Sequence, residues 1–156
     1  MKKIAQMLVV MLVALSTHAA SVQGDIILPF SVLDTNKTVQ TKEVGDDVKA
    51  TWTCRVGEFH GWQTIFAQVN MINKGSKPMW GQCSLAFYDS DKNLIGTTTQ
   101  NFIARRGLKP GAKKAGMWRI ILPKDRYKDV VSYQVVVNET TSPPSRNKET
   151  TLLEDP

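Results

Sequence analysis

Apolar and polar residues alternate along much of this chain, which is the pattern of β-strands with one buried face. The clearest segment is 50–56, ATWTCRV, in which every second residue from Ala50 to Val56 points to a common apolar face. Segments 64–72, 81–88 and 131–137 also show strong strand patterns, and weaker ones lie at 25–33, 95–103 and 115–122. The pattern predicts about seven strands, with Pro29 placing the 25–33 segment at an edge or a bulge.

Polar segments that contain Gly, Pro, Asp or Asn separate the predicted strands, and these are residues that favour chain reversal. They lie at 73–78, 89–93, 108–114 and 123–129. No stretch of twelve residues carries a convincing helical stripe. Several short strands at this spacing predict an all-β protein, either a sandwich or a small barrel.

The two ends of the chain differ from the strand-forming part. Residues 1–19 combine Lys2 and Lys3, an apolar run and small residues, which is the form of a secretory signal peptide. The apolar run is shorter than the ~20 residues that span a bilayer. Without a cysteine at its end for acylation, we expect cleavage after Ala19 and a periplasmic or secreted protein. The polar, proline-containing segment 139–156 predicts a disordered tail, which leaves one domain at 20–138.

The chain has two cysteines, Cys54 and Cys83, and both lie after the predicted signal peptide. Each falls on the apolar face of its strand. An even number of cysteines in an oxidising compartment predicts one disulfide, which would stabilise the fold by roughly 3–4 kcal/mol. A redox or metal-binding pair would favour CxxC spacing, and these two residues do not have it.

The segment from Asp89 to Asn93, DSDKN, spaces three oxygen-bearing side chains like the start of a calcium loop. An EF-hand loop also needs glycine at position 6 and glutamate at position 12, but Leu94 and Gln100 stand there. The same residues suit a turn, in which Asp89 accepts backbone hydrogen bonds and Asn93 adopts a positive φ. We therefore predict a hairpin turn and no metal.

Residues that could support catalysis are sparse. His60 is the only histidine beyond the predicted signal peptide, and no nucleophile motif or clustered Cys/His spacing accompanies it. A single loop histidine is more often solvated or hydrogen-bonded than catalytic. The expectation is that the protein is not an enzyme and has no cofactor.

Basic residues concentrate between Arg105 and Lys128. The candidates for binding are Arg105, Arg106, Lys113 and Lys114. Such a patch could meet anionic lipid, lipopolysaccharide phosphates or an acidic protein, or it could be a solvated face. Loss of Lys2 and Lys3 with the signal peptide would lower the net charge only from +6 to +4. No interleaved aromatic residues suggest a nucleic-acid platform, so nucleic acid is not an expected partner.

Four tryptophans are present: Trp52, Trp62, Trp80 and Trp118. At least two should lie in the core, because they alternate in phase with other apolar residues. Trp80 follows a Lys-Pro turn, and Trp62 follows His60 and Gly61. These two are the candidates for exposed anchors that bind a partner, a role in which tryptophan is enriched.

The segment from Ile65 to Val137 resembles the FxLYD domain family of bacterial exported and envelope proteins. The motif residues Leu85 to Asp89, LAFYD, carry the resemblance, together with the preceding AQVNMINKG, the following DKNLIGT, the turn LKPG and the final strand VSYQVVV. Asn93 stands where the family often has glycine, and Trp80 and the cysteines are additions. The resemblance implies an immunoglobulin-like β-sandwich that serves as an interaction module.

Together with the absence of a catalytic set, the resemblance predicts a non-enzymatic protein-interaction module that is exported. Its expected partner is another envelope protein, in a bacterial cell-envelope or secretion complex. The alternative is a binder of anionic envelope surfaces or a small ligand, acting through the basic loops at 105–128.

Overall fold

The computed structural model describes residues 18–26, 30, 38–102, 106–123 and 126–143. The strands within this part are β1 (His18–Asp25), β2 (Val39–Gln40), β3 (Val48–Phe59), β4 (Trp62–Asn73), β5 (Trp80–Tyr88), β6 (Leu94–Asn101), β7 (Lys113–Ile121) and β8 (Ser132–Thr140). One short 3₁₀ helix, η1 (Arg126–Asp129), is the only helical element in the described ranges. The protein is therefore all-β, as the alternation predicts.

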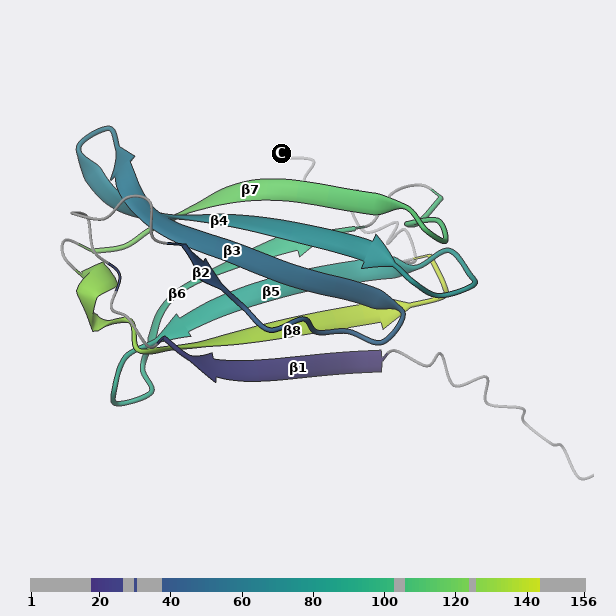
Figure 1. Ribbon diagram of the computed structural model, residues 1–156, viewed down its shortest axis with the longest axis horizontal. Helices are drawn as coiled ribbons and strands as arrows, with labels where there is room; N and C mark the ends of the chain where they lie inside the picture. Colours follow the sequence, from purple (N-terminus) through teal and green to yellow (C-terminus); the bar gives the residue numbers. More distant parts are fainter. Residues whose placement is uncertain (1–17, 27–29, 31–37, 103–105, 124–125, 144–156) are drawn as a thin grey trace, which may run out of the picture.

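The strands form two antiparallel sheets of four strands each (Figure 1). One sheet has the order β1-β8-β5-β6, and the other has the order β2-β3-β4-β7. The longest pairing joins β3 and β4 over twelve residue pairs, from Val48↔Asn73 to Phe59↔Trp62. The predicted sandwich of sheets is confirmed, and strands β3 to β8 correspond to six of the predicted segments.

The core lies between the two sheets and takes alternate residues from each strand. Its largest fully buried side chains include Trp52, Phe87, Phe102, Ile65 and Leu85. Trp52 makes an edge-to-face contact with Trp118, with 6.2 Å between ring centroids. Trp52 is thus the central core tryptophan, and Trp118 packs against the core from β7.

The first strand differs from the prediction. It spans 18–25, before most of the predicted 25–33 segment, and it pairs with β8 from His18↔Glu139 to Asp25↔Ser132. Of the predicted segment, residues 27–29 and 31–33 lie outside the described ranges. Its sequence has only Ala20 and Val22 as partly buried apolar residues, so the alternation is faint. The predicted cleavage after Ala19 would fall inside β1, and the residues of β1 after Ala19 would remain in the strand. Residues 1–17 lie outside the described ranges. Ile26 and Phe30 are buried, and Pro29 lies outside the described residues.

The last strand continues further than the predicted domain boundary at residue 138. β8 ends at Thr140, and Glu139, which we placed at the start of the tail, is only 3% exposed. Its Oε1 accepts hydrogen bonds from the backbone amides of Asp46 (2.9 Å) and Asp47 (3.0 Å), and its Oε2 accepts one from Val48 (2.7 Å). Glu139 therefore ties the end of one sheet to the start of β3 in the other. Residues 144–156 lie outside the described part.

The predicted disulfide is wrong in this structure, because Cys54 and Cys83 are both free thiols. Both are buried on the inward faces of β3 and β5, as the alternation predicts. The indole N–H of Trp52 donates a hydrogen bond to Cys83 Sγ at 3.0 Å, so the neighbour of this sulfur is the indole. Burial raises the pKa of each thiol to about 12.

These thiols should be unreactive in the folded protein. At pH 8 a water-soluble alkylating reagent is expected to leave both unmodified, because the thiolate is the reactive form and burial disfavours it. In denaturant without reductant, mass spectrometry should find both Cys54 and Cys83 alkylated. A denatured chain that takes up reagent only after reduction would contradict the free-thiol assignment.

The segment 89–93 forms the predicted turn between β5 and β6. Asp89 Oδ1 accepts hydrogen bonds from the amides of Asp91 (3.0 Å) and Asn93 (2.8 Å), and Asp89 Oδ2 accepts one from Arg126 at 3.3 Å. The pKa of Asp89 is lowered, first by the hydrogen bond from the backbone of Asn93. The positive φ falls on Lys92, at 65°, instead of on Asn93.

Candidate interaction surface

The β3–β4 hairpin ends in a two-residue turn at His60 and Gly61, whose φ angles are 50° and 76°. Positive φ at both central residues is typical of a type I′ turn, whose twist matches that of the flanking strands. The turn places Phe59 directly opposite Trp62. The hairpin extends beyond the body of the sandwich at one corner (Figure 1). It therefore presents two aromatic residues at a projecting tip.

Two arginines lie over aromatic rings on the outer face of this sheet. The guanidinium carbon of Arg119 is 3.9 Å from the centre of the Phe59 ring, and that of Arg55 is 4.7 Å from the Phe66 ring. Both distances are within the range of cation–π attraction, worth about 0.5–1 kcal/mol at exposed sites. The strand register places Phe66 opposite both Arg55 and Arg119. The four side chains thus occupy neighbouring positions across β3, β4 and β7.

Gly57 allows the Phe66 ring to lie close to the backbone of β3. A Cβ atom at Gly57 would meet the Phe66 ring at 2.8 Å and an Arg55 guanidinium nitrogen at 3.1 Å. Any larger residue at this position would push the ring and the guanidinium apart. The absence of a side chain at Gly57 therefore helps to hold Phe66 in its place beneath Arg55.

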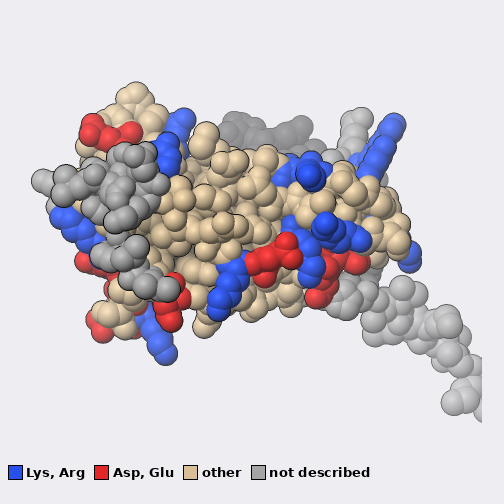
Figure 2. Space-filling view, in the orientation of Figure 1, with Lys and Arg blue, Asp and Glu red and all other residues tan. Residues whose placement is uncertain are grey.

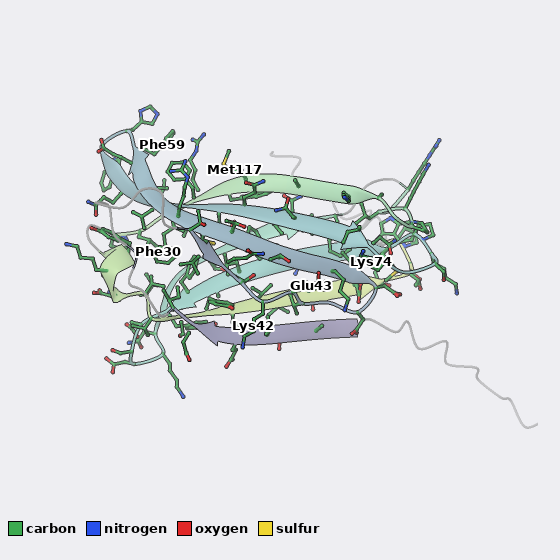
Figure 3. The ribbon with its side chains drawn as sticks, viewed as in Figure 1. Phe30, Lys42, Glu43, Phe59, Lys74 and Met117 are labelled. Atoms are coloured by element: carbon green, nitrogen blue, oxygen red, sulfur yellow. The ribbon has the colours of Figure 1, made fainter. Side chains whose placement is uncertain are left out.

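Large apolar side chains around these arginines are open to solvent. Trp62 is 58% exposed, Met117 is 68% exposed and Ile121 is 62% exposed. Met117 projects from β7 at the end of the sheet that carries Phe59 (Figure 3). We define the outer-face cluster as the residues that share this surface, which are Arg55, Phe59, Trp62, Phe66, Met117, Arg119 and Ile121.

The outer-face cluster has the composition of a protein-binding surface. Aromatic residues, Met and Arg are enriched in protein–protein interfaces. Figure 2 views this sheet from outside and shows a broad uncharged area with both basic and acidic residues at its margins. Rigid rings next to guanidinium groups can supply apolar contact together with hydrogen bonds to a carboxylate. Within the described ranges, no group of three or more His, Cys, Asp or Glu residues could hold a metal ion.

The structure separates the predicted site residues. Trp62 belongs to the outer-face cluster, whereas Trp80, Lys113 and Lys114 lie at the opposite end of the sandwich, because Lys113 pairs with Ile72 near the end of β4. Arg106 precedes Gly107, and a Cβ at Gly107 would meet the Trp80 ring at 2.9 Å. Trp80 is therefore half-buried against this loop and is not a freely exposed anchor. Arg105 lies outside the described residues.

Hydrogen bonds join two basic loops at that opposite end. The Asn73 side-chain amide donates to the carbonyls of Leu108 (2.7 Å) and Lys77 (2.8 Å), and the Asn73 carbonyl accepts from the Gly111 amide at 2.8 Å. These bonds bring together exposed cations from turn 73–78 and from segment 106–113. We define the basic end as Lys74, Lys77, Arg106, Lys109 and Lys113.

The rest of the predicted basic run has other partners. The Lys114 ammonium group donates a hydrogen bond to the Asn101 carbonyl at 2.7 Å. Arg119 stacks on Phe59, and Arg126 forms ion pairs with Asp89 at 3.3 Å and with Asp129 at 2.8 Å. The stretch 105–128 is therefore not one continuous patch, and only part of it contributes to the basic end.

Of the outer-face cluster, the sequence patterns indicated only Trp62 as a candidate for binding. Phe66 stands among polar residues on the outward side of its strand, and this exception to the alternation was the one available signal. Arg55 and Phe59 also fall on outward positions of one strand. Nothing in the sequence placed Met117 and Arg119 beside them, because that requires the pairing of β4 with β7.

Two comparisons with known protein sequences find no relatives of this chain. A scan against protein-family models finds no match to this chain, and a search of curated proteins also finds none. Across the described residues, no helix has the length and apolar character needed to cross a membrane.

Proposed function

We propose that this protein is a non-enzymatic interaction module that binds another protein through the outer-face cluster. The observation that carries the proposal is the solvent-exposed group of Trp62, Met117 and Ile121 around the Arg119–Phe59 stack. Leaving several large apolar side chains in water is unfavourable unless a partner covers them, and contiguous exposed apolar surface often marks an interaction site. The arginines would orient the partner by pairing with its carboxylates.

The sequence supports an interaction outside the cytoplasm, with a protein of the cell envelope. The signal-like segment 1–19 favours export, and the resemblance of residues 65–137 to FxLYD domains favours an immunoglobulin-like accessory module. The two four-stranded antiparallel sheets are compatible with such a domain. The partner would then be an envelope protein, and the module would be an accessory subunit of a bacterial envelope or secretion complex.

Site-specific photo-cross-linking in the producing cells tests this proposal. A photoreactive amino acid at Met117 should give one dominant cross-linked product, because this side chain points into the proposed interface. The matched control is Leu94, which is 57% exposed but belongs to β6 of the other sheet. Equal or absent cross-linking at the two positions would count against the outer-face cluster. Met117→Lys should reduce co-purification of the same product.

A second candidate function is binding of an anionic envelope surface by the basic end. The observation that favours it is the hydrogen-bonded junction of Asn73 with Leu108 and Gly111, which gathers five exposed cations. Binding to vesicles of anionic phospholipid should weaken steeply with salt, because exposed charges are screened over ~10 Å at 0.1 M ionic strength. Arg106→Glu with Lys113→Glu should abolish that binding, and unchanged binding would leave the basic end as a solvated surface.

A further inference from the structure

We propose that the partner of the outer-face cluster contributes an extended, acidic segment that adds to strand β7 as a fifth strand of the β2-β3-β4-β7 sheet. This inference rests on the proposed function and specifies how the same surface is used. β7 is the last strand of its sheet, with β4 as its neighbour on the other side. Extended peptides commonly bind at such edges, where backbone hydrogen bonds give affinity and side chains give specificity.

The geometry of β7 suits an added strand. Its register with β4 runs unbroken through nine pairs, from Thr64↔Ile121 to Ile72↔Lys113. The strand contains no proline, and the only register shift recorded among the described pairings lies between Phe87 and Tyr88 in β5. Short edges, bulges, prolines and charged side chains, especially lysine, are the devices that normally discourage strand addition. β7 has nine residues, no bulge and no proline, and its charges, Lys113, Lys114 and Arg119, are all positive. Strand addition at this edge therefore requires a partner whose carboxylates match these cations.

The other edge strands of the described ranges are less suited to this role. β2 has only two residues. The exposed positions of β1 are small or polar, namely Ala19, Ser21, Gln23 and Asp25. β6 begins with the exposed Leu94 but continues with exposed Thr97, Thr99 and Asn101. β7 is the edge that continues directly into the exposed apolar surface.

The side chains of β7 specify the chemistry of the added strand. Its exposed row contains two cationic and three apolar residues, in the order Lys113, Ala115, Met117, Arg119 and Ile121. No acidic residue occurs in β7. On one face of an antiparallel pair, directly opposed residues interact, and opposite charges are favourable. A complementary strand therefore has carboxylates opposite Lys113 and Arg119 and apolar side chains opposite Met117 and Ile121.

The arrangement around Arg119 supports an acidic partner over a neutral one. The guanidinium carbon lies over the Phe59 ring at 3.9 Å from its centre, and a guanidinium on an aromatic face can still donate hydrogen bonds to a carboxylate. Arg119 is itself exposed, so a carboxylate on an added strand can approach it without displacing a core residue. The adjacent Arg55, stacked on Phe66, adds to the positive potential of the same surface.

A synthetic nine-residue peptide serves as the probe. It carries Glu opposite Lys113 and Arg119 and Val opposite Met117, and its ends are acetylated and amidated. Fluorescence anisotropy should detect binding, and hydrogen exchange should show new protection of β7 amides. N-methylation of the peptide amides that face β7 leaves the side chains in place but removes backbone donors. It should weaken binding about tenfold or more, because several hydrogen bonds are lost together.

Charge exchange tests the predicted specificity. Arg119→Glu should weaken binding of the acidic probe about five- to tenfold and should restore binding of a second probe in which Lys replaces Glu. Lys42→Glu, the matched charge reversal beside β2 at the opposite edge of the same sheet, should alter affinity less than about twofold. Both substituted residues are exposed, so both variants should keep the fold.

The outcomes separate this inference from the proposed function. If the acidic probe does not bind up to about 1 mM, or binds equally well when N-methylated, strand addition is wrong. A dominant cross-link at Met117 would still support the interaction module in that case. A second copy of this chain is the other possible occupant of the β7 edge. In that case the β7 amides become protected from hydrogen exchange as the protein concentration rises, without any peptide, and Met117→Lys yields a monomer. That result would overturn the proposal of an acidic partner segment.

Discussion

Replacing Glu139 with alanine is expected to lower the free energy of unfolding by about 2–4 kcal/mol, since hydrogen bonds to charged groups are worth about 1.5–3 kcal/mol and orphaned buried donors are costly. The carboxylate accepts three backbone hydrogen bonds, from Asp46, Asp47 and Val48, at 2.7–3.0 Å. Alanine would remove the acceptor of all three amides, of which the Val48 amide is buried and those of Asp46 and Asp47 are partly buried. Chemical denaturation followed by tryptophan fluorescence measures the change.

The geometry around Glu139 explains why this effect should be large. Reciprocal hydrogen bonds between Val44 and Ala50, at 2.8 and 3.0 Å, close the base of the loop that supplies the amides. Gly45, with φ of 110°, begins that loop, and a Cβ there would lie 1.9 Å from the Val48 carbonyl oxygen. The loop is thus shaped around the carboxylate.

Glu43→Ala provides the matched control for Glu139→Ala. Glu43 lies in the segment preceding the same loop and is exposed (Figure 3). Its replacement removes the same charge without removing the three hydrogen bonds, so stability should change by no more than about 0.5 kcal/mol. Equal losses for the two variants would attribute the effect to net charge, and the link between the sheets would then contribute little.

The sequence predicted those features that depend on local alternation. Trp52, Cys54, Ile65 and Leu85 all alternate in phase with their neighbours, and all are buried in the structure. The turn at Asp89 was predictable for a similar reason, because the hydrogen bonds that Asp89 accepts from Asp91 and Asn93 join residues no more than four positions apart. Period-two patterning and turn chemistry are local properties, so a single sequence carries them directly.

Features that depend on distant pairing could not be predicted in the same way. Glu139 was placed in a polar tail because its neighbours are hydrophilic, yet its hydrogen-bond partners lie more than 90 positions earlier. The stack of Arg119 on Phe59 likewise requires β7 to pair with β4, which nothing in either segment indicates. The even cysteine count suggested a bond, but the count says nothing about which side chain lies next to each sulfur.

Replacing Trp52 with alanine should destabilise the fold by about 3–5 kcal/mol, the usual range for removing a large aromatic residue from a core. Trp52 is fully buried, contacts Trp118 edge-to-face and donates its indole N–H to Cys83 Sγ at 3.0 Å. A loss of this size is a large share of the ~5–15 kcal/mol that stabilises an ordinary domain, so the variant should unfold at much lower denaturant concentration.

Two further substitutions show which property of Trp52 matters. Trp52→Phe keeps most of the apolar volume but loses the N–H donor, so it should cost less than the alanine variant. Trp62→Ala removes the same side chain from a position that is 58% exposed, and it should change stability by about 1 kcal/mol or less. The same Trp62 variant should nevertheless impair partner binding if the outer-face cluster is an interface. Similar destabilisation by Trp52→Ala and Trp62→Ala would contradict the assignment of one tryptophan to the core and the other to the binding surface.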